Sequence, residues 1–89
     1  MSKVVMYTTG FCPFCIMAKR IFDDMKVPYE EIRVDKHLKK REEMMEITNR
    51  RTVPQVFIGD HHVGGYDDMQ DALRSGQLNV WLKEAGIHV

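Results

Sequence analysis

The sequence predicts an α/β fold in which helices cover the faces of a mixed β-sheet. In the first half of the chain, apolar runs of strand length alternate with segments whose apolar residues recur at helical spacing. A hairpin signature follows in the second half. The opening strand–helix–strand unit should be a right-handed crossover between parallel strands, to which the hairpin adds antiparallel strands. With 89 residues, the chain fits a single domain over residues 1–89.

The first half contains two predicted strands and the helix between them. Val4–Tyr7 is a β-branched and apolar run that ends at Thr8-Thr9-Gly10, as a buried central strand would. Pro13 suits the first position of a helix, and Val27-Pro28 should end that helix. Tyr29–Val34 alternates in polarity and should form the second strand. The inward face of the helix should carry Cys15, Ala18, Phe22 and Met25. The outer face offers two oppositely charged pairs at helical spacing, Lys19/Asp23 and Arg20/Asp24.

A second helix and a hairpin are expected next. The helix should run from about His37 to Thr48, with Asp35 as its cap. The hairpin should pair Val56–Ile58 with His61–Val63 around Gly59-Asp60, and end at Gly64-Gly65. The apolar residues of the helix are Leu38, Met44, Met45 and Ile47.

Two short helices should complete the chain. Asp67, followed three residues later by Gln70, resembles a capping box for a helix that continues through Leu73. Gly76 should close this helix. The last helix should end at Gly86, and its apolar face should consist of Leu78, Trp81, Leu82 and Ala85.

The charge balance argues against a nucleic-acid-binding module. Lys and Arg total 13, Asp and Glu also total 13, and the net charge is zero, whereas such modules carry a basic excess. The one basic run, residues 36–41, is interpreted as a solvated helix face balanced by Glu42, Glu43 and Glu46. The N-terminal apolar stretch is too short for a signal peptide, and nothing approaches the length of a membrane span. We therefore expect a soluble cytoplasmic protein without membrane partners, in which thiols stay mostly reduced.

Cys12-Pro13-Phe14-Cys15 lies where the first strand leads into the first helix. If Pro13 is the first helical residue, Cys12 occupies the exposed cap position and Cys15 lies on the inward face. Free N–H groups and the helix dipole should stabilise a thiolate at Cys12, lowering its pKa from ~8.5 to about 3.5–7.5. Such a thiolate attacks a disulfide, and the second thiol can resolve the mixed disulfide. The pattern predicts a thiol–disulfide oxidoreductase.

Three other interpretations of the two cysteines are weaker. A zinc site needs about four ligands, and the histidines that might join the cysteines lack ligand spacing. These histidines are His37, His61, His62 and His88. A structural disulfide does not suit a reducing compartment. Two incidental core cysteines would not explain a proline at a helix start beside an exposed cysteine.

Four segments taken together resemble the glutaredoxin pattern, and the resemblance extends from Val4 to about Leu82. They are Tyr7-Thr8 leading to Cys12-Pro13-Phe14-Cys15, Thr52-Val53-Pro54, Val56-Phe57-Ile58, and Gly64-Gly65 followed by Tyr66-Asp67-Asp68. The resemblance implies a thioredoxin fold, with a four-stranded mixed sheet and helices on both faces. It also implies a monomer without a metal, which uses glutathione to reduce protein disulfides and glutathione mixed disulfides. Cys12 would then be the nucleophile and Cys15 the resolving thiol.

The resemblance also implies a glutathione site. From the residues alone, Pro54 is expected to follow an ordinary trans bond, whereas the family has a cis proline that faces the nucleophile. Val53 would pair with glutathione through its backbone, as an added strand would. Asp67 or Asp68 would pair with the γ-glutamyl ammonium, although helix capping alone also accounts for both aspartates. Arg50 and Arg51 offer cations for the glycyl carboxylate. The remaining expected contacts are Phe14, Thr52, Gly65 and Tyr66.

The chain departs from the family pattern at three positions. Thr9 stands where many relatives have lysine, Phe14 replaces the commoner tyrosine, and Tyr66 replaces a frequent cysteine. Two alternative functions are less well supported. Pro13 argues against an iron–sulfur cluster carrier, whose relatives usually have a small residue there. Gly64-Gly65-x-Asp-Asp and the short length argue against a thioredoxin-type reductase fed by a flavoprotein.

Overall fold

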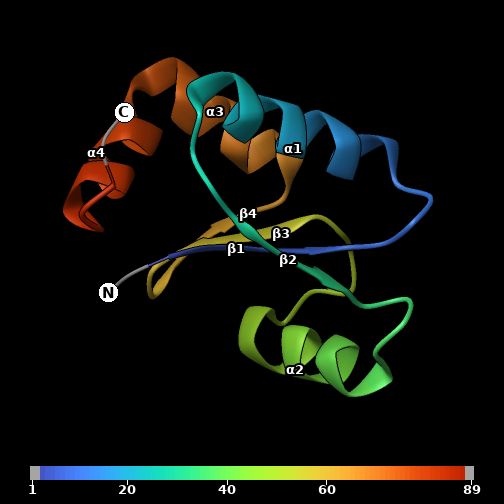
Figure 1. Cartoon of the computed structure of the whole chain (residues 1–89). Coiled ribbons are helices and arrows are strands. Elements are labelled where there is room, and N and C mark those ends of the chain that lie inside the picture. The colour runs from blue at the N-terminus through green and yellow to red at the C-terminus, as the bar shows by residue number, and fades with distance from the viewer. Residues whose placement is uncertain (1–2, 88–89) are drawn as a thin grey trace.

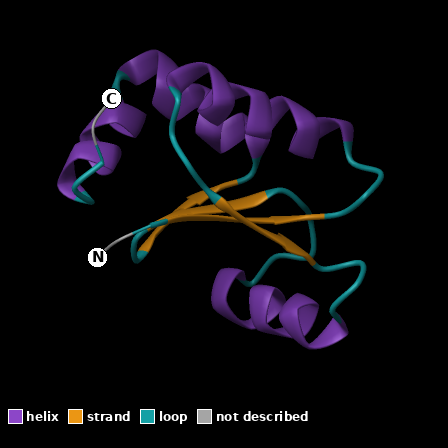
Figure 2. Ribbon diagram, in the orientation of Figure 1, coloured by secondary structure: helices purple, strands orange, loops and turns teal. Residues whose placement is uncertain are grey.

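The computed structural model describes residues 3–87, which form a four-stranded sheet and four helices (Figures 1 and 2). No helix in this range has both the length and the apolar character needed to cross a membrane. In chain order the elements are β1 (Val4–Thr8), α1 (Pro13–Met25), β2 (Glu30–Arg33), α2 (Leu38–Thr48), β3 (Gln55–Ile58), β4 (His61–Gly64), α3 (Tyr66–Ser75) and α4 (Gln77–Glu84).

The sheet has the strand order β2-β1-β3-β4, so the predicted buried strand β1 is central. β1 pairs with β2 in parallel, with Tyr7 opposite Ile32. It pairs with β3 in the antiparallel sense, with Val5 opposite Phe57. β3 and β4 form the predicted hairpin. The mixed sheet with a parallel crossover and an antiparallel hairpin is therefore confirmed.

Helices cover both faces of the sheet. α1, α3 and α4 lie on one face and α2 lies on the other (Figure 1). Because side chains alternate along a strand, Met6 of β1 faces the three-helix side and Tyr7 faces α2. The larger core contains Val4, Met6, Ala18, Phe22, Val27, Val56, Ile58, Val63, Met69, Ala72, Leu78 and Leu82. The smaller core is formed by Tyr7, Val34 and Met44.

The predicted inward face of α1 is confirmed, but its outer ion pairs are wrong. Cys15, Ala18 and Phe22 are buried, and Met25 packs against the same core. Lys19 reaches across to the neighbouring strand instead of to Asp23, and its Nζ lies 2.5 Å from Glu31 Oε2. No Arg20/Asp24 ion pair forms among the described residues either. The tertiary partner prevails because Glu31 is also held by Thr8 Oγ1, which donates to it at 2.6 Å.

The prediction for α2 was wrong in its cap and in half of its apolar face. The helix begins at Leu38 with His37 as cap residue, and Asp35 pairs with Arg33 instead. Leu38 is 70% exposed and Ile47 is 53% exposed, since only one narrow side of α2 touches the sheet. Buried on that side are Met44 and Thr48, with Met45 packed beside them. The basic run, residues 36–41, is exposed throughout, as predicted.

The start of α3 also differs from the prediction. The helix begins at Tyr66 with Gly65 at the cap position. Asp68 Oδ2 accepts the Gly65 N–H at 3.0 Å, so the carboxylate that closes the first turn belongs to Asp68. The predicted Asp67/Gln70 capping box is therefore wrong. Gly76 closes the helix as predicted, in a left-handed conformation with φ 84°.

Candidate active site

The start of α1 holds the two cysteines in the predicted positions. Pro13 is the first helical residue, and Cys12 precedes it as the cap with an extended backbone. The Cys15 N–H donates to Cys12 Sγ at 3.0 Å, so the sulfur takes the place of an ordinary capping oxygen. A negative charge on this sulfur would be stabilised by that N–H and by the positive end of the helix dipole.

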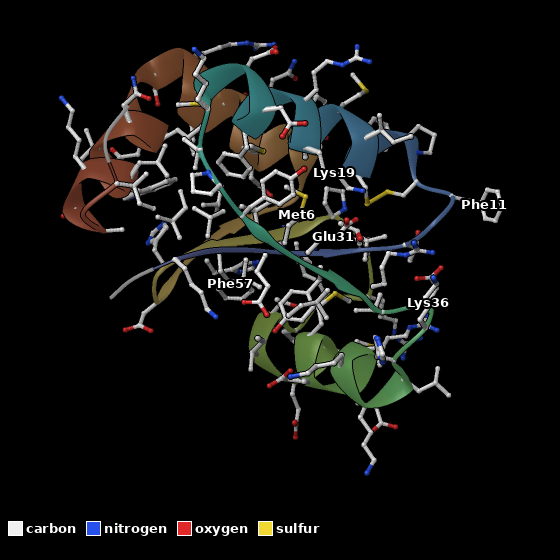
Figure 3. All side chains as sticks on the ribbon, in the orientation of Figure 1. Met6, Phe11, Lys19, Glu31, Lys36 and Phe57 are labelled. Atoms are coloured by element: carbon white, nitrogen blue, oxygen red, sulfur yellow. A yellow bond between two sulfur atoms is a disulfide. The ribbon has the colours of Figure 1, made fainter. Side chains whose placement is uncertain are left out.

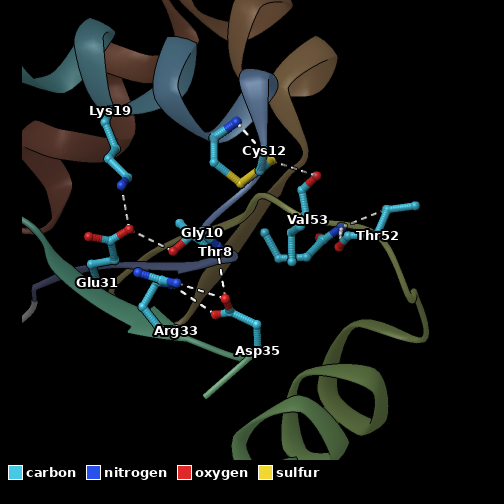
Figure 4. Close-up of a disulfide and its surroundings, with 11 residues drawn as sticks. Thr8, Gly10, Cys12, Lys19, Glu31, Arg33, Asp35, Thr52 and Val53 are labelled. Atoms are coloured by element: carbon cyan, nitrogen blue, oxygen red, sulfur yellow. Dashed lines mark hydrogen bonds and ion pairs between the residues drawn. A yellow bond between two sulfur atoms is a disulfide. The ribbon is translucent and has the colours of Figure 1, made fainter. Parts of the chain in front are cut away.

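The structure shows the oxidised form, in which a disulfide joins Cys12 to Cys15 (Figure 4). The expectation that Cys12 is exposed is wrong for this form, because its residue exposure is 8% and that of Cys15 is 1%. Cys12 Sγ is turned towards Cys15 and lies 3.7 Å from the Val53 carbonyl oxygen. A disulfide sulfur has no proton to donate, so this approach is a contact.

The loop before Cys12 is held by an ion pair that the sequence analysis did not foresee. The Gly10 N–H donates to Asp35 Oδ2 at 3.0 Å. Arg33 holds the same carboxylate from the other side with two hydrogen bonds of 2.8 and 2.7 Å. The hydrogen bonds from Arg33, supported by the Gly10 N–H, hold the pKa of Asp35 well below its usual range. A Cβ at Gly10 would meet the Arg33 guanidinium, which would have to shift to make room.

Phe11 is the most exposed large apolar residue of the described chain. Its ring projects into solvent beside the disulfide loop (Figure 3). Phe11 directly precedes Cys12 in the chain.

A cavity of about 280 Å³ opens near the disulfide and brings together nine of the ten residues expected at the glutathione site. The residues come from three separate segments, which the hairpin and the start of α3 bring side by side. They are Phe14, Arg50, Thr52, Val53, Pro54, Gly65, Tyr66, Asp67 and Asp68. Arg51 instead lines a neighbouring cavity at the end of α2, with Arg50 between the two.

The Val53–Pro54 peptide bond is cis, as the resemblance implied. The trans bond expected from the residues alone is therefore wrong. Pro54 is buried, and the Val53 carbonyl faces Cys12 as described above.

One part of the cavity lining is charged and another part is aromatic. Arg50 Nη1 lies 2.9 Å from Asp68 Oδ2, the oxygen that also accepts the Gly65 N–H. The hydrogen bond from Arg50, followed by that from Gly65, lowers the pKa of Asp68. The rings of Phe14 and Tyr66 stack with their centroids 5.7 Å apart. The cavity thus offers a cation, carboxylates, backbone N–H groups and an aromatic wall.

Two polar residues beneath the cavity were missed by the sequence analysis. Gln55 is fully buried, and its Nε2 lies 3.0 Å from the Thr52 carbonyl oxygen and 3.2 Å from Thr52 Oγ1. His62 Nε2 lies 2.7 Å from Gln55 Oε1. The available signal was a polar residue, Gln55, between Pro54 and the apolar run that begins at Val56.

The zinc interpretation finds no support in the described range. Within residues 3–87, no three His, Cys, Asp or Glu side chains gather into a group that could hold a metal ion. His88, one of the histidines considered for such a site, lies outside the described residues.

We expect iodoacetamide to alkylate Cys12 well before Cys15 in the reduced protein. The helix start and the Cys15 N–H stabilise the Cys12 thiolate, whereas Cys15 is buried. The rate at Cys12, measured against pH by mass spectrometry, should follow a pKa clearly below ~8.5. The matched control is the same protein unfolded in guanidinium chloride, in which the two cysteines should react alike. A folded-state midpoint at or above ~8.5 would contradict thiolate stabilisation.

Known proteins resemble this chain in both sequence and fold. The family model described as glutaredoxin matches residues 4–63. The chain is 42% identical to a glutaredoxin of Pseudomonas aeruginosa over 82 residues, which cover 92% of this chain and 98% of that protein. It is 40% identical to glutaredoxin 3 of Escherichia coli strain K12 over 83 residues, which cover 93% of this chain and all of that protein.

Solved structures agree with the sequence comparisons. The crystal structure of a buckwheat glutaredoxin–glutathione complex superposes with a TM-score of 0.90 at 31% identity, covering 99% of this chain and 83% of that one. The solution structure of glutaredoxin from Brucella melitensis gives a TM-score of 0.81 at 36% identity, covering 100% and 96% of the two chains. The fold is thus the thioredoxin-like glutaredoxin fold. With its Cys12–Cys15 pair at the start of α1, this chain belongs to the glutaredoxin family as a dithiol member and a thiol–disulfide oxidoreductase.

Proposed function

We propose that this protein uses glutathione to reduce protein disulfides and glutathione mixed disulfides. The observation that carries the proposal is the cavity of about 280 Å³ beside Cys12, whose lining combines charged, backbone and aromatic groups. Glutathione carries two carboxylates, an ammonium group and a peptide backbone, and each has a suitable counterpart in that lining. The buckwheat relative, which has the same fold, was crystallised as a complex with glutathione.

The reaction with a glutathione mixed disulfide takes two exchange steps. The Cys12 thiolate attacks the glutathione sulfur, a new S–S bond forms, and the substrate protein leaves as a thiolate. A second glutathione thiolate then attacks the sulfur of the bound glutathione. Glutathione disulfide is released and the Cys12 thiolate is regenerated. The net exchange consumes one free glutathione thiol and converts the mixed disulfide into the protein thiol and glutathione disulfide.

A protein disulfide is reduced by a different second step. Cys12 first forms a mixed disulfide with one substrate sulfur, and the other substrate sulfur leaves as a thiolate. Cys15 then attacks Cys12 Sγ and releases the reduced substrate. This step leaves the Cys12–Cys15 disulfide, the form present in the structure. Two glutathione molecules return the pair to the dithiol.

We assign each end of glutathione to a group of the cavity. The Val53 backbone pairs with the cysteinyl residue, and N–H groups at the start of α3 hold the γ-glutamyl carboxylate. Asp67 or Asp68 takes the γ-glutamyl ammonium, and Arg50 takes the glycyl carboxylate. In the free protein Arg50 and Asp68 neutralise each other at 2.9 Å, so glutathione would exchange this pair for two ligand contacts.

The proposal extends to the partners and the setting of the reaction. The other partners are disulfide-bearing or glutathionylated proteins. We also propose a monomer with a single domain over residues 1–89, because the helices of the described chain pack on one four-stranded sheet. Glutathione-dependent reduction requires a reducing compartment, which supports the cytoplasm as its location.

The function is tested by a mixed-disulfide reduction assay with purified protein. We expect reduction of a glutathionylated peptide to require glutathione, and to saturate as its concentration rises. The control replaces glutathione with dithiothreitol at an equal thiol concentration. Equal catalysis with both reductants, without saturation by glutathione, would contradict the proposal.

Replacing Asp67 and Asp68 with Asn one at a time should weaken glutathione use in at least one variant. Asn keeps much of the capping ability but removes the charge. A partly exposed charged contact contributes on the order of 1 kcal/mol, which corresponds to a rise of about fivefold in the glutathione KM. Ala variants at both positions, compared by urea unfolding, measure capping separately. If both Asn variants keep the parent's glutathione kinetics, the ammonium contact is absent and Asp68 acts only as the helix cap.

A further inference from the structure

A chain of hydrogen bonds runs beneath the cavity from β4 to the cis-proline segment. It starts at His62, passes through the fully buried side chain of Gln55, and ends on both the carbonyl oxygen and the hydroxyl of Thr52. The three links measure 2.7, 3.0 and 3.2 Å. The chain therefore connects a histidine outside the cavity to a residue that lines it.

The Thr52 carbonyl oxygen determines which group donates and which accepts in every hydrogen bond of this chain. A backbone carbonyl oxygen can only accept, so the amide nitrogen of Gln55 must face Thr52. The Gln55 oxygen then faces His62, and it too can only accept. His62 Nε2 must therefore carry the proton. Burial, reinforced by the nearby Arg50 charge, lowers the pKa of His62 and favours its neutral form at physiological pH.

The assignment of donors and acceptors also determines which hydrogen bond the Thr52 hydroxyl can make to a ligand in the cavity. Its hydroxyl oxygen already accepts from Gln55 Nε2 at 3.2 Å. Its own proton is therefore directed elsewhere, and Thr52 is exposed and lines the cavity. A hydroxyl held in this way is a donor for an anionic ligand group, such as a carboxylate. Successive bonds that all point the same way also polarise and strengthen one another.

The His62 ring is held in place by its neighbours. It lies opposite Phe57 in the β3–β4 ladder, and the two rings stack with centroids 4.8 Å apart. Gln55 precedes Val56 in β3 and follows Pro54 directly, so a shift of its amide would be passed to the cis-proline segment. The Val53 carbonyl in that segment lies 3.7 Å from Cys12 Sγ.

We infer that His62, as its Nε2–H tautomer, is a positioning residue for glutathione. Through Gln55 it holds the Thr52 hydroxyl as a donor towards a ligand carboxylate, and it fixes the Thr52–Val53 backbone beside Cys12. This inference rests on the proposed function, because the ligand that it serves is glutathione. His62 touches neither the ligand nor the reacting sulfurs in this scheme.

The tautomer can be tested without any activity measurement. We expect long-range ¹H–¹⁵N correlation spectra of the protein at neutral pH to show the ring proton of His62 on Nε2. The spectrum of His61→Phe lacks the signals of the other hairpin histidine and so identifies them. A proton on Nδ1 in neutral His62 would overturn the inference.

Two substitutions at His62 separate the hydrogen bond from the packing. His62→Phe keeps a ring that can stack on Phe57 but loses the donor. His62→Gln loses the ring but has an amide N–H that can donate to Gln55. We expect His62→Phe to raise the glutathione KM about fivefold with kcat changed less than twofold, and His62→Gln to recover much of the loss. Alkylation of Cys12 by iodoacetamide should stay at the parent's rate in both variants.

The matched control is His61→Phe, since His61 is exposed and adjacent, and its ring packs at a tilt against Trp81 instead. It should leave the glutathione KM unchanged. If His62→Phe folds, as judged by near-UV circular dichroism, and matches the parent's KM, the inference is wrong. Gln55→Met removes the amide and is the reference for a broken hydrogen-bond chain. If His62→Phe fails to fold, the test compares His62→Gln with this reference. A His62→Gln variant that is as stable as the parent but has a glutathione KM as high as that of Gln55→Met also overturns the inference. A parent enzyme that does not depend on glutathione would refute the proposed function itself.

Discussion

Replacing Cys12 with Ser should abolish every disulfide reductase activity of the protein, whereas Cys15→Ser should remain active on small glutathione mixed disulfides. Cys12 is the cap residue whose sulfur accepts the Cys15 N–H, and a serine hydroxyl at that place does not form a disulfide. Cys15 is 1% exposed, so it reaches substrates only through Cys12. Loss of Cys15 should therefore affect only reactions that need an internal resolving thiol.

The measurement compares two substrates for each variant. Rates are taken with a glutathionylated peptide and with a protein disulfide, at the same glutathione concentration. We expect Cys15→Ser to keep most of the peptide rate and to lose most of the intramolecular route for the protein substrate. Equal inactivation of both variants on the peptide would refute the assignment of nucleophile and resolving thiol. Urea unfolding under reducing conditions shows whether each variant is folded.

Phe22→Ala should be the most destabilising of the single core truncations on α1. Phe22 is fully buried in the larger core, with its ring 6.0 Å from that of Tyr29. Removing a buried phenylalanine ring loses transfer energy and leaves a cavity, which together cost ~3–5 kcal/mol. Urea unfolding of the reduced protein, monitored by circular dichroism, measures the loss.

The matched control lies on the opposite side of the same helix. Ile16 is 55% exposed, and Ile16→Ala should change the free energy of unfolding by less than ~0.5 kcal/mol. A loss below ~1 kcal/mol for Phe22→Ala would mean that the core at α1 is loosely packed, contrary to its complete burial.

Local patterns were enough to predict most of the elements and the arrangement of the cysteines. Val4–Tyr7 lacks charge and is β-branched, Pro13 marks a helix start, and Gly59-Asp60 separates two strand-like runs. Each signal lies within a few residues of the feature that it predicts. The observed β1, α1 and hairpin follow from such signals.

The partners of charged side chains could not be predicted from such local patterns. Asp35 was expected to cap a helix, but Arg33 and the Gly10 N–H hold it in the folded protein. Lys19 likewise leaves its helical neighbour for Glu31. Each charged side chain had a possible role close by in the sequence, as a helix cap for Asp35 or as the partner of Asp23 for Lys19. In the folded protein another contact is reinforced by a distant segment: the Gly10 N–H donates to Asp35, and Thr8 donates to Glu31. Only the assembled sheet brings these segments together.

The glutathione site depended on the resemblance more than on the residues. A proline is cis in only ~5–6% of X–Pro bonds, so Pro54 alone argued for the wrong isomer. The nine cavity residues come from three segments, and no local signal joins Phe14 to Asp68. The Gln55–His62 network was missed because polar side chains in a strand are normally assigned to its solvent side.

The short separation of the two cysteines limits how much their cross-link stabilises the fold. Only three positions separate Cys12 from Cys15 along the chain. A cross-link stabilises a protein by restricting its denatured ensemble, an effect of about 2 kcal/mol for so small a loop and about 4.7 kcal/mol for one of 100 residues. The two packed cores, and not the sulfur bridge, therefore carry most of the stability of this protein. An enzyme that breaks and remakes its own disulfide in every turnover changes its folding equilibrium by roughly 30-fold each time, far less than a cross-link around a long loop would.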